Sequence, residues 1–190
     1  MNVLVTGDLS TMAGAICKQI CHNHKVIFAG KEIGDKRLDK KAEAYSIEPD
    51  DPMFPKLFAS FCFHTVVFLA ACGGQTDQIR TGMLEKLESV LRLSRENNVT
   101  QVLFLSSTEV YAGNIEVNET VEPAPDSSRG IILAAGENLC KYYRSRMGLN
   151  TVILRIPYLY GENERDSLLA RMVTEGARKG RIVLPGRKEQ

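Results

Sequence analysis

The sequence predicts an α/β fold in which a doubly wound parallel sheet carries helices on its faces. Short apolar runs alternate along the chain with longer segments that suit helices. The two strongest runs, Thr65–Ala71 and Val102–Ser106, are apolar instead of alternating with polar residues, as expected for strands buried on both faces of a parallel sheet. The chain also opens with an apolar run at Asn2–Thr6, a turn at Gly7 and a helical pattern from Met12 onward, which is the strand-turn-helix order of such a sheet.

The remaining elements follow from the same patterns. The other expected strands are Val26–Ala29, Tyr45–Ile47 and Thr151–Ile156. The expected later helices are Asp35–Ala44, Phe54–Ser60, Asp77–Asn97, Ile131–Met147 and Asp166–Lys179. No internal repeat or linker interrupts this succession, so we expect a single domain over residues 1–190.

Composition narrows the possible functions. The 190 residues include 24 Lys and Arg against 23 Asp and Glu, so the charge gives no electrostatic case for a nucleic-acid partner. The longest apolar run, Val66–Cys72, is far short of the roughly 20 residues that span a bilayer, and the start of the chain lacks the basic lead of a signal peptide. We therefore expect a cytoplasmic protein without membrane or nucleic-acid partners.

The cysteines predict neither disulfides nor a metal site. Their number is odd, five, and no two follow the Cys-x-x-Cys spacing, which favours reduced thiols. Cys17, Cys21 and His22 do share helical spacing, as some metal ligands do. Buried thiols explain the two cysteines more simply, because the same helix has apolar residues to bury.

The turn after the first strand is a candidate phosphate site. In a doubly wound sheet this turn presents unpaired helix N–H groups to a pyrophosphate. It reads Thr-Gly-Asp-Leu-Ser-Thr-Met-Ala-Gly over residues 6–14, with Ser10 where the second glycine of a G-x-x-G-x-x-G pattern is expected. The candidate cofactor contacts in the turn are Gly7, Ser10, Thr11 and Met12. The alternative is that Gly7 only makes a tight turn.

The end of the second strand bears on the choice of cofactor. An acidic residue there would bind the ribose hydroxyls of NAD, but this chain has Ala-Gly-Lys ending at Lys31. A cation suits a 2′-phosphate better, which slightly favours NADP over NAD. Lys31 also opens a mixed-charge stretch that is more simply read as a solvated helix and its approach.

Four segments in register resemble one family. The segment Val102–Tyr111 resembles the strand and Ser-Ser-x-x-Val-Tyr motif of the extended short-chain dehydrogenase/reductases, the NAD-dependent epimerase/dehydratase family that acts on nucleotide sugars. Val3–Gly7 resembles the opening strand and turn of that family, Val66–Ala71 its fourth strand, and Leu154–Gly161 its Leu-Arg to Tyr-Gly segment. The resemblance runs from Asn2 to about Gly186 and implies a Rossmann-like NAD(P)-binding domain with a nucleotide or nucleotide sugar as ligand.

The resemblance also implies site residues. Ser107 falls on the catalytic hydroxyl of the family, and Glu48 falls on the Asp that touches the adenine. The end of the fourth strand and the Leu-Arg segment are expected to lie against the cofactor through Leu69, Ala70, Ala71 and Pro157.

The proton relay of the family is missing. In the family a Tyr-x-x-x-Lys pair shares a helix face, so that the Lys lowers the pKa of the Tyr, which passes a proton while hydride moves. Aligning the helix on Glu137 puts Arg129 at the Tyr and Leu133 at the Lys, and neither side chain can do that work. We therefore expect weak or lost redox activity. The residues do not decide whether the chain still binds the cofactor. The alternative function is a non-catalytic dinucleotide-binding sensor or a dimeric scaffold.

Glu109 is a second candidate near Ser107. Thr108-Glu109 resembles the Asp-Glu pair of the sugar 4,6-dehydratases, with Thr in place of the acid. Glu109 could serve as a base, although an exposed carboxylate at the end of the strand is the simpler expectation. Tyr111 matches a structural tyrosine of the family.

Two further expectations concern partners and length. The run Ile131–Ala135 contains no polar residue, so a neighbour must cover it. Because the family dimerises through this helix and the preceding long one, we expect a homodimer through Asp77–Asn97 and Ile131–Met147. Ile182–Gly186 resembles the segment just ahead of the family's substrate-binding part, so we expect the chain to be truncated there, with the substrate domain largely missing.

Overall fold

The computed structural model of the chain describes residues 1–7, 11–31, 41–70, 82–112, 117–157 and 168–181. The chain divides into two compact units, Met1–Pro157 and Tyr158–Gln190. The first unit holds a sheet and its helices, and the described part of the second contains α5 (Leu168–Lys179). No helix among the described residues is both long and apolar enough to cross a bilayer.

The first unit is built on a six-stranded parallel sheet. Its strands are β1 (Asn2–Gly7), β2 (Lys25–Ala29), β3 (Glu43–Tyr45), β4 (Thr65–Leu69), β5 (Gln101–Ser107) and β6 (Thr151–Ile156). They lie in the order β3-β2-β1-β4-β5-β6, and every neighbouring pair is parallel. The direction of winding reverses between β1 and β4, which is where a doubly wound sheet opens a ligand-binding crevice. The predicted fold class is confirmed.

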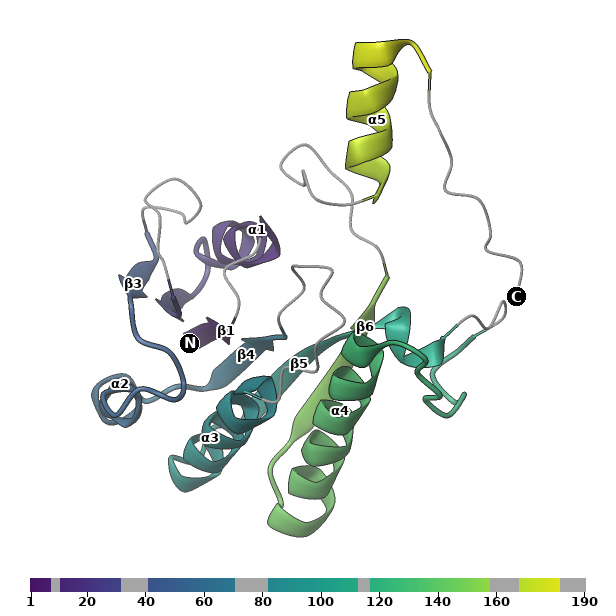
Figure 1. Ribbon diagram of the computed structural model, residues 1–190. Coiled ribbons are helices and arrows are strands. Elements are labelled where there is room, and N and C mark those ends of the chain that lie inside the picture. The colour runs from purple at the N-terminus through teal and green to yellow at the C-terminus, as the bar shows by residue number, and fades with distance from the viewer. Residues whose placement is uncertain (8–10, 32–40, 71–81, 113–116, 158–167, 182–190) are drawn as a thin grey trace. The chain divides into compact units, whose positions relative to one another are not determined.

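Helices cover both faces of the sheet (Figure 1). They are α1 (Thr11–Ile20) on one face, and α2 (Phe54–Ser60), α3 (Gly82–Glu96) and α4 (Ser128–Met147) on the other. Successive β4 residues point to opposite faces, so Val66 and Phe68 join the core under α2, α3 and α4 while Val67 and Leu69 join the core under α1. The continuous apolar runs of the sequence therefore reflect strands buried on both sides.

Element boundaries differ from the predicted ones at three places. β3 covers Glu43–Tyr45 instead of Tyr45–Ile47, because all three of its residues pair with β2. The helix predicted over Asp35–Ala44 is therefore wrong at its end, where Glu43 and Ala44 are in the strand, and residues 35–40 lie outside the described residues. α4 starts at Ser128, three residues before the predicted start, because the Ser127 hydroxyl accepts a hydrogen bond from the Gly130 N–H at 3.0 Å and caps the helix. The short helix η1 (Thr108–Tyr111) was not predicted.

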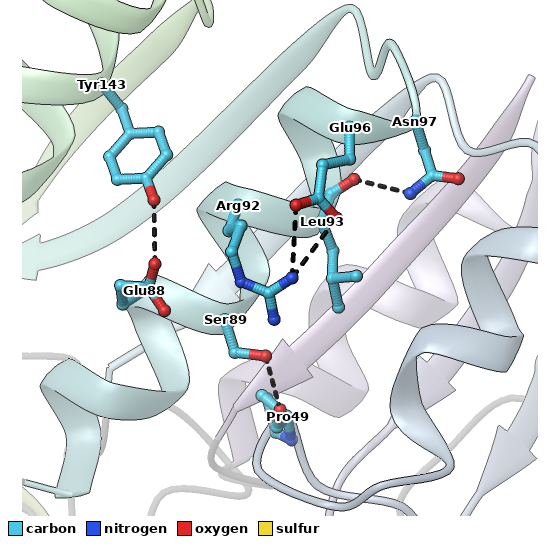
Figure 2. A network of polar contacts seen from close by, with 8 residues as sticks. All are labelled: Pro49, Glu88, Ser89, Arg92, Leu93, Glu96, Asn97 and Tyr143. Atoms are coloured by element: carbon cyan, nitrogen blue, oxygen red, sulfur yellow. Dashed lines mark hydrogen bonds and ion pairs between the residues drawn. The ribbon is translucent and has the colours of Figure 1, made fainter.

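α3 is fixed on two sides by polar contacts (Figure 2). The Tyr143 hydroxyl of α4 donates to Glu88 at 3.0 Å, and Ser89 donates to the Pro49 carbonyl at 2.8 Å. Burial, followed by the hydrogen bond to Glu88, raises the pKa of Tyr143 to about 12. The loop after β3 is therefore tied to the same helix that packs on α4.

Gly7 is the backbone position at which the sheet tolerates no side chain. Its φ is +108°, and a Cβ placed there would lie 2.1 Å from the Leu69 carbonyl oxygen of β4. We predict that Gly7→Ala lowers the free energy of unfolding by about 3 kcal/mol, from backbone strain and this clash, measured by urea denaturation. Gly82→Ala is the matched control, since nothing lies within 4 Å of a Cβ there. A loss for Gly7→Ala no larger than that of the control would contradict this account.

Candidate functional site

The carboxyl ends of the six parallel strands meet at one edge of the sheet, and the expected site residues that the structure describes gather there. Gly7 ends β1 and pairs with Leu69 at the end of β4. Ser107 ends β5 and is buried. The others follow strand ends: buried Ala70 after β4, exposed Lys31 after β2, half-buried Glu48 after β3, and exposed Pro157 after β6.

Two of the expected cofactor contacts, Ser10 in the phosphate turn and Ala71 after β4, lie outside the described residues. Thr11 is the first residue of α1, and its side chain is also outside them. Met12 is half-buried and packs against the core under α1. Cys17 and Cys21, on the same helix, are buried in that core. Within the part of the chain that is described, no group of three or more side chains could hold a metal ion.

Glu48 is held by a cation that the sequence did not indicate. Lys86 of α3 lies 2.5 Å from the Glu48 carboxylate and 3.7 Å from that of Asp50. The Lys86 and Glu48 side chains are partly exposed, 24% and 32%, so the pair contributes modestly to stability. Its effect is to fix the carboxylate at the end of β3, where the resemblance expects an adenine contact.

A fully buried carboxylate, that of Glu137, lies next to the carboxyl ends of β5 and β6. Glu137 of α4 has no exposed surface. It accepts a hydrogen bond from the Ser106 hydroxyl at 2.7 Å and two from Arg155, from Nε at 2.9 Å and from Nη2 at 2.7 Å. The hydrogen-bonded carboxylate raises the pKa of Arg155 above its already high ordinary value. A bidentate pair, the strong geometry for Arg and carboxylate, thus joins α4 to β6, and the Ser106 hydroxyl adds β5.

The same guanidinium reaches η1. Arg155 Nη1 donates to the Tyr111 hydroxyl, and the guanidinium carbon lies 4.7 Å from the centre of the Tyr111 ring. The Tyr111 hydroxyl donates in turn to the Asn118 carbonyl at 2.8 Å. Tyr111 is buried and serves as a structural residue, as expected.

Next to Ser107 an ion pair stands where the resemblance expects the relay. The Ser107 hydroxyl accepts the Glu109 N–H at 3.2 Å and caps η1. The Glu109 carboxylate lies 3.0 Å from Arg129 Nη1, and the Glu109 side chain is 23% exposed. The expectation of an exposed carboxylate was therefore wrong, because Glu109 faces a cation on α4. The sequence had singled out both residues, but nothing in their spacing linked them.

Leu133 and Gly130 show how closely α4 fits its surroundings. Leu133 is 2% exposed and belongs to the core under α3 and α4. A Cβ at Gly130 would lie 2.6 Å from the Glu109 carbonyl oxygen, so the start of α4 packs directly on η1. At the two positions where the resemblance expects the relay, the helix thus has an ion-paired guanidinium and a hydrocarbon side chain in the core.

Comparison with known proteins identifies similar chains. The model of the "NAD dependent epimerase/dehydratase family" matches residues 3–190. An uncharacterized UDP-glucose epimerase, YtcB, of Bacillus subtilis (strain 168) is 28% identical over 109 residues, which are 56% of this chain and 34% of that protein. A uronate dehydrogenase of Pseudomonas syringae pv. tomato is 29% identical over 85 residues, 43% of this chain and 30% of that protein.

Solved structures share the fold over the whole chain. The UDP-glucose 4-epimerase of Thermotoga maritima, solved with UDP-glucose, aligns with a TM-score of 0.85 at 23% identity, covering 100% of this chain and 67% of that one. The UDP-glucuronic acid 4-epimerase of Bacillus cereus, in complex with UDP-glucuronic acid and NAD, aligns with a TM-score of 0.81 at 20% identity, covering 98% and 66%. The matches therefore span about a third of the curated relatives and two thirds of these structures.

We predict that the Glu137 pair contributes strongly to stability. Arg155→Met leaves a fully buried carboxylate without its counter-charge, so it should lower the free energy of unfolding by about 3 to 5 kcal/mol in urea denaturation. Arg92→Met is the matched control: its exposed pair with Glu96 on α3 should change stability by less than about 1 kcal/mol. Equal losses in the two variants would show that the buried pair is not a special constraint.

Proposed function

Because the chain belongs to the NAD dependent epimerase/dehydratase family, we propose that it binds a nicotinamide dinucleotide and a nucleotide sugar but transfers hydride between them weakly or not at all. One observation carries the proposal: the position expected for the relay phenol holds Arg129, which is ion-paired with Glu109 at 3.0 Å. The surrounding edge keeps the features expected for binding, including the Gly7 turn and the closely paired ends of β1 and β4.

The described residues fit the cofactor's binding. Gly7, whose missing side chain lets β1 lie flush against β4, together with Leu69 and Ala70, would accept the dinucleotide at the switch point. Glu48, held by Lys86, would face the adenine. The exposed cation of Lys31 suits a 2′-phosphate, which slightly favours NADP over NAD. The cofactor supplies the hydride acceptor when bound. Support comes from relatives whose structures hold NAD.

The residues at the positions expected for the proton relay do not fit hydride transfer. A hydride leaving a sugar carbon requires the hydroxyl proton on that carbon to leave as well, and the relay Tyr takes it in the family. A guanidinium cannot serve as the proton acceptor and a leucine side chain has no ionisable group, so with Arg129 and Leu133 at these positions Ser107 would be left only to orient the hydroxyl. A positioned proton acceptor is worth roughly 10²- to 10⁴-fold in rate, and we propose that this factor is lost.

We also propose a homodimer through α3 and α4, the arrangement that suits a sensor or scaffold. On α4, Ile131 and Tyr142 are 45% and 49% exposed. They are eleven residues apart, which is three turns, so they lie on one face of the helix. Large apolar side chains exposed along one helix face are what a partner helix covers.

Calorimetry tests the binding part of the proposal. We expect the protein to bind NAD or NADP with micromolar affinity, and Lys31→Met to weaken NADP binding more than NAD binding, because only NADP carries the 2′-phosphate. Lys56→Met, at an exposed residue of α2, is the charge-matched control. An absence of binding to either dinucleotide would leave only the scaffold function.

Restoring the relay tests the chemical part. Arg129→Tyr with Leu133→Lys should raise hydride transfer from a UDP-sugar by about 10²-fold or more over the unmodified protein. Leu133→Lys places a charge in the core, so we expect a loss of about 3 kcal/mol in unfolding free energy unless the cofactor is bound. An unmodified protein that turns over as fast as the restored variant would contradict the proposed loss of catalysis.

Light scattering with size-exclusion chromatography tests the dimer. The protein at micromolar concentration should elute with twice the chain mass, and Ile131→Glu with Tyr142→Glu should give the monomer, because both charges would have to be buried. Met53→Glu, at an equally exposed apolar residue before α2, should leave the mass unchanged. A monomeric unmodified protein would refute the dimer.

A further inference from the structure

Arg129 uses its hydrogen-bonding capacity incompletely. Its ion pair with Glu109 is made through Nη1 at 3.0 Å. Its Nε is buried and has no hydrogen-bond partner among the described residues. A buried donor without a partner has lost its water and gained nothing in return, so the ion pair with Glu109 leaves this guanidinium incompletely satisfied.

Arg155 shows what a satisfied guanidinium looks like in the same chain. It binds Glu137 through both Nε and Nη2 and uses Nη1 on the Tyr111 hydroxyl, and its side chain is 14% exposed. Arg129, by contrast, is 35% exposed. One arginine is therefore built into the framework, while the other keeps unused donors and access to solvent beside the carboxyl edge.

The Ser107 hydroxyl contacts the same residue as Arg129, Glu109. The Ser107 hydroxyl oxygen accepts the Glu109 N–H, and in the described part of the chain no acceptor takes the hydroxyl hydrogen. Ser107 ends β5, which is the neighbour of β4 at the switch point. Both side chains contact Glu109: Arg129 pairs with its carboxylate, and the Ser107 oxygen accepts a hydrogen bond from its backbone N–H.

We propose that Arg129, assisted by the Ser107 hydroxyl, binds an oxyanion of the ligand and exchanges Glu109 for it. A planar guanidinium matches two oxygens of a carboxylate or a phosphate at once, so reorientation toward such a group would satisfy the donors that Glu109 leaves unused. The inference rests on the proposed function in one respect: the oxyanion is taken to be the diphosphate of a nucleotide sugar or the carboxylate of its sugar.

Glu109 is then a competitor for Arg129 and not part of the binding surface. This gives the two halves of the ion pair opposite effects. Removing the Arg129 charge should weaken binding, whereas removing the Glu109 charge should strengthen it, because the guanidinium no longer has an internal partner and the acidic repulsion of the ligand disappears. A merely structural ion pair would make both changes harmful.

The experiment is titration calorimetry on the full chain with inorganic pyrophosphate, UDP, UDP-glucose and UDP-glucuronate. We expect Arg129→Met to lower the affinity for the group that Arg129 binds by roughly 10- to 100-fold, Arg129→Lys to restore part of it, and Glu109→Gln to raise it by about two- to fivefold. Arg92→Met and Glu96→Gln are the controls, since they alter an exposed Arg-Glu pair on α3 made through the same Nη1 atom.

The four probes separate the sources of the oxyanion. Loss of affinity for every probe in Arg129→Met assigns the diphosphate, and loss for UDP-glucuronate alone assigns the sugar carboxylate. If pyrophosphate binds through Arg129 but no nucleotide binds, the proposed function fails and this inference stands. Affinities that Arg129→Met leaves unchanged, a Glu109→Gln variant that binds more weakly, or a protein that binds none of the probes would each overturn the inference.

Discussion

A carboxylate without any exposed surface, that of Glu137, is the constraint on which the rest of the site depends. Such a group stays charged in a protein core only if donors replace its water. Ser106 and Arg155 provide three, and in doing so they fix α4, β5 and β6 against one another. Burial, followed by the charge of Glu137, also raises the pKa of the nearby Cys140 thiol to about 12.

The consequence is that the position of η1 beside β5 and β6 does not depend on the ion pair between Arg129 and Glu109. Tyr111, held by Arg155, sets the position of η1, and Gly130 lets α4 start directly against it. Arg129 and Glu109 occupy the surface of that framework. The proposed loss of the proton relay at Arg129 therefore concerns a side chain that lies outside the Glu137, Ser106 and Arg155 contacts that hold the framework together.

The sequence predicted what short-range periodicity encodes. Runs such as Thr65–Ala71 revealed the buried parallel strands, and the Gly7 turn located the edge. The early start of α4 was missed because the Ser127 cap depends on one hydrogen bond and not on an apolar pattern. The pairs that build the site were missed for another reason. Arg155 and Glu137 lie 18 residues apart, and the contact between Glu109 and Arg129 exists only after the Gly130 packing has brought α4 to η1, so neither follows from local spacing.

The most direct test of the central claim, that the cleft survives without its relay, is a single-turnover measurement. Stoichiometric protein, oxidised cofactor and UDP-glucose are mixed while the ultraviolet absorbance of reduced nicotinamide is followed and cofactor binding is monitored in the same sample. The account predicts a bound cofactor and no reduced nicotinamide on the timescale of a turnover. Rapid appearance of reduced nicotinamide would contradict it, since another group would then be taking the proton.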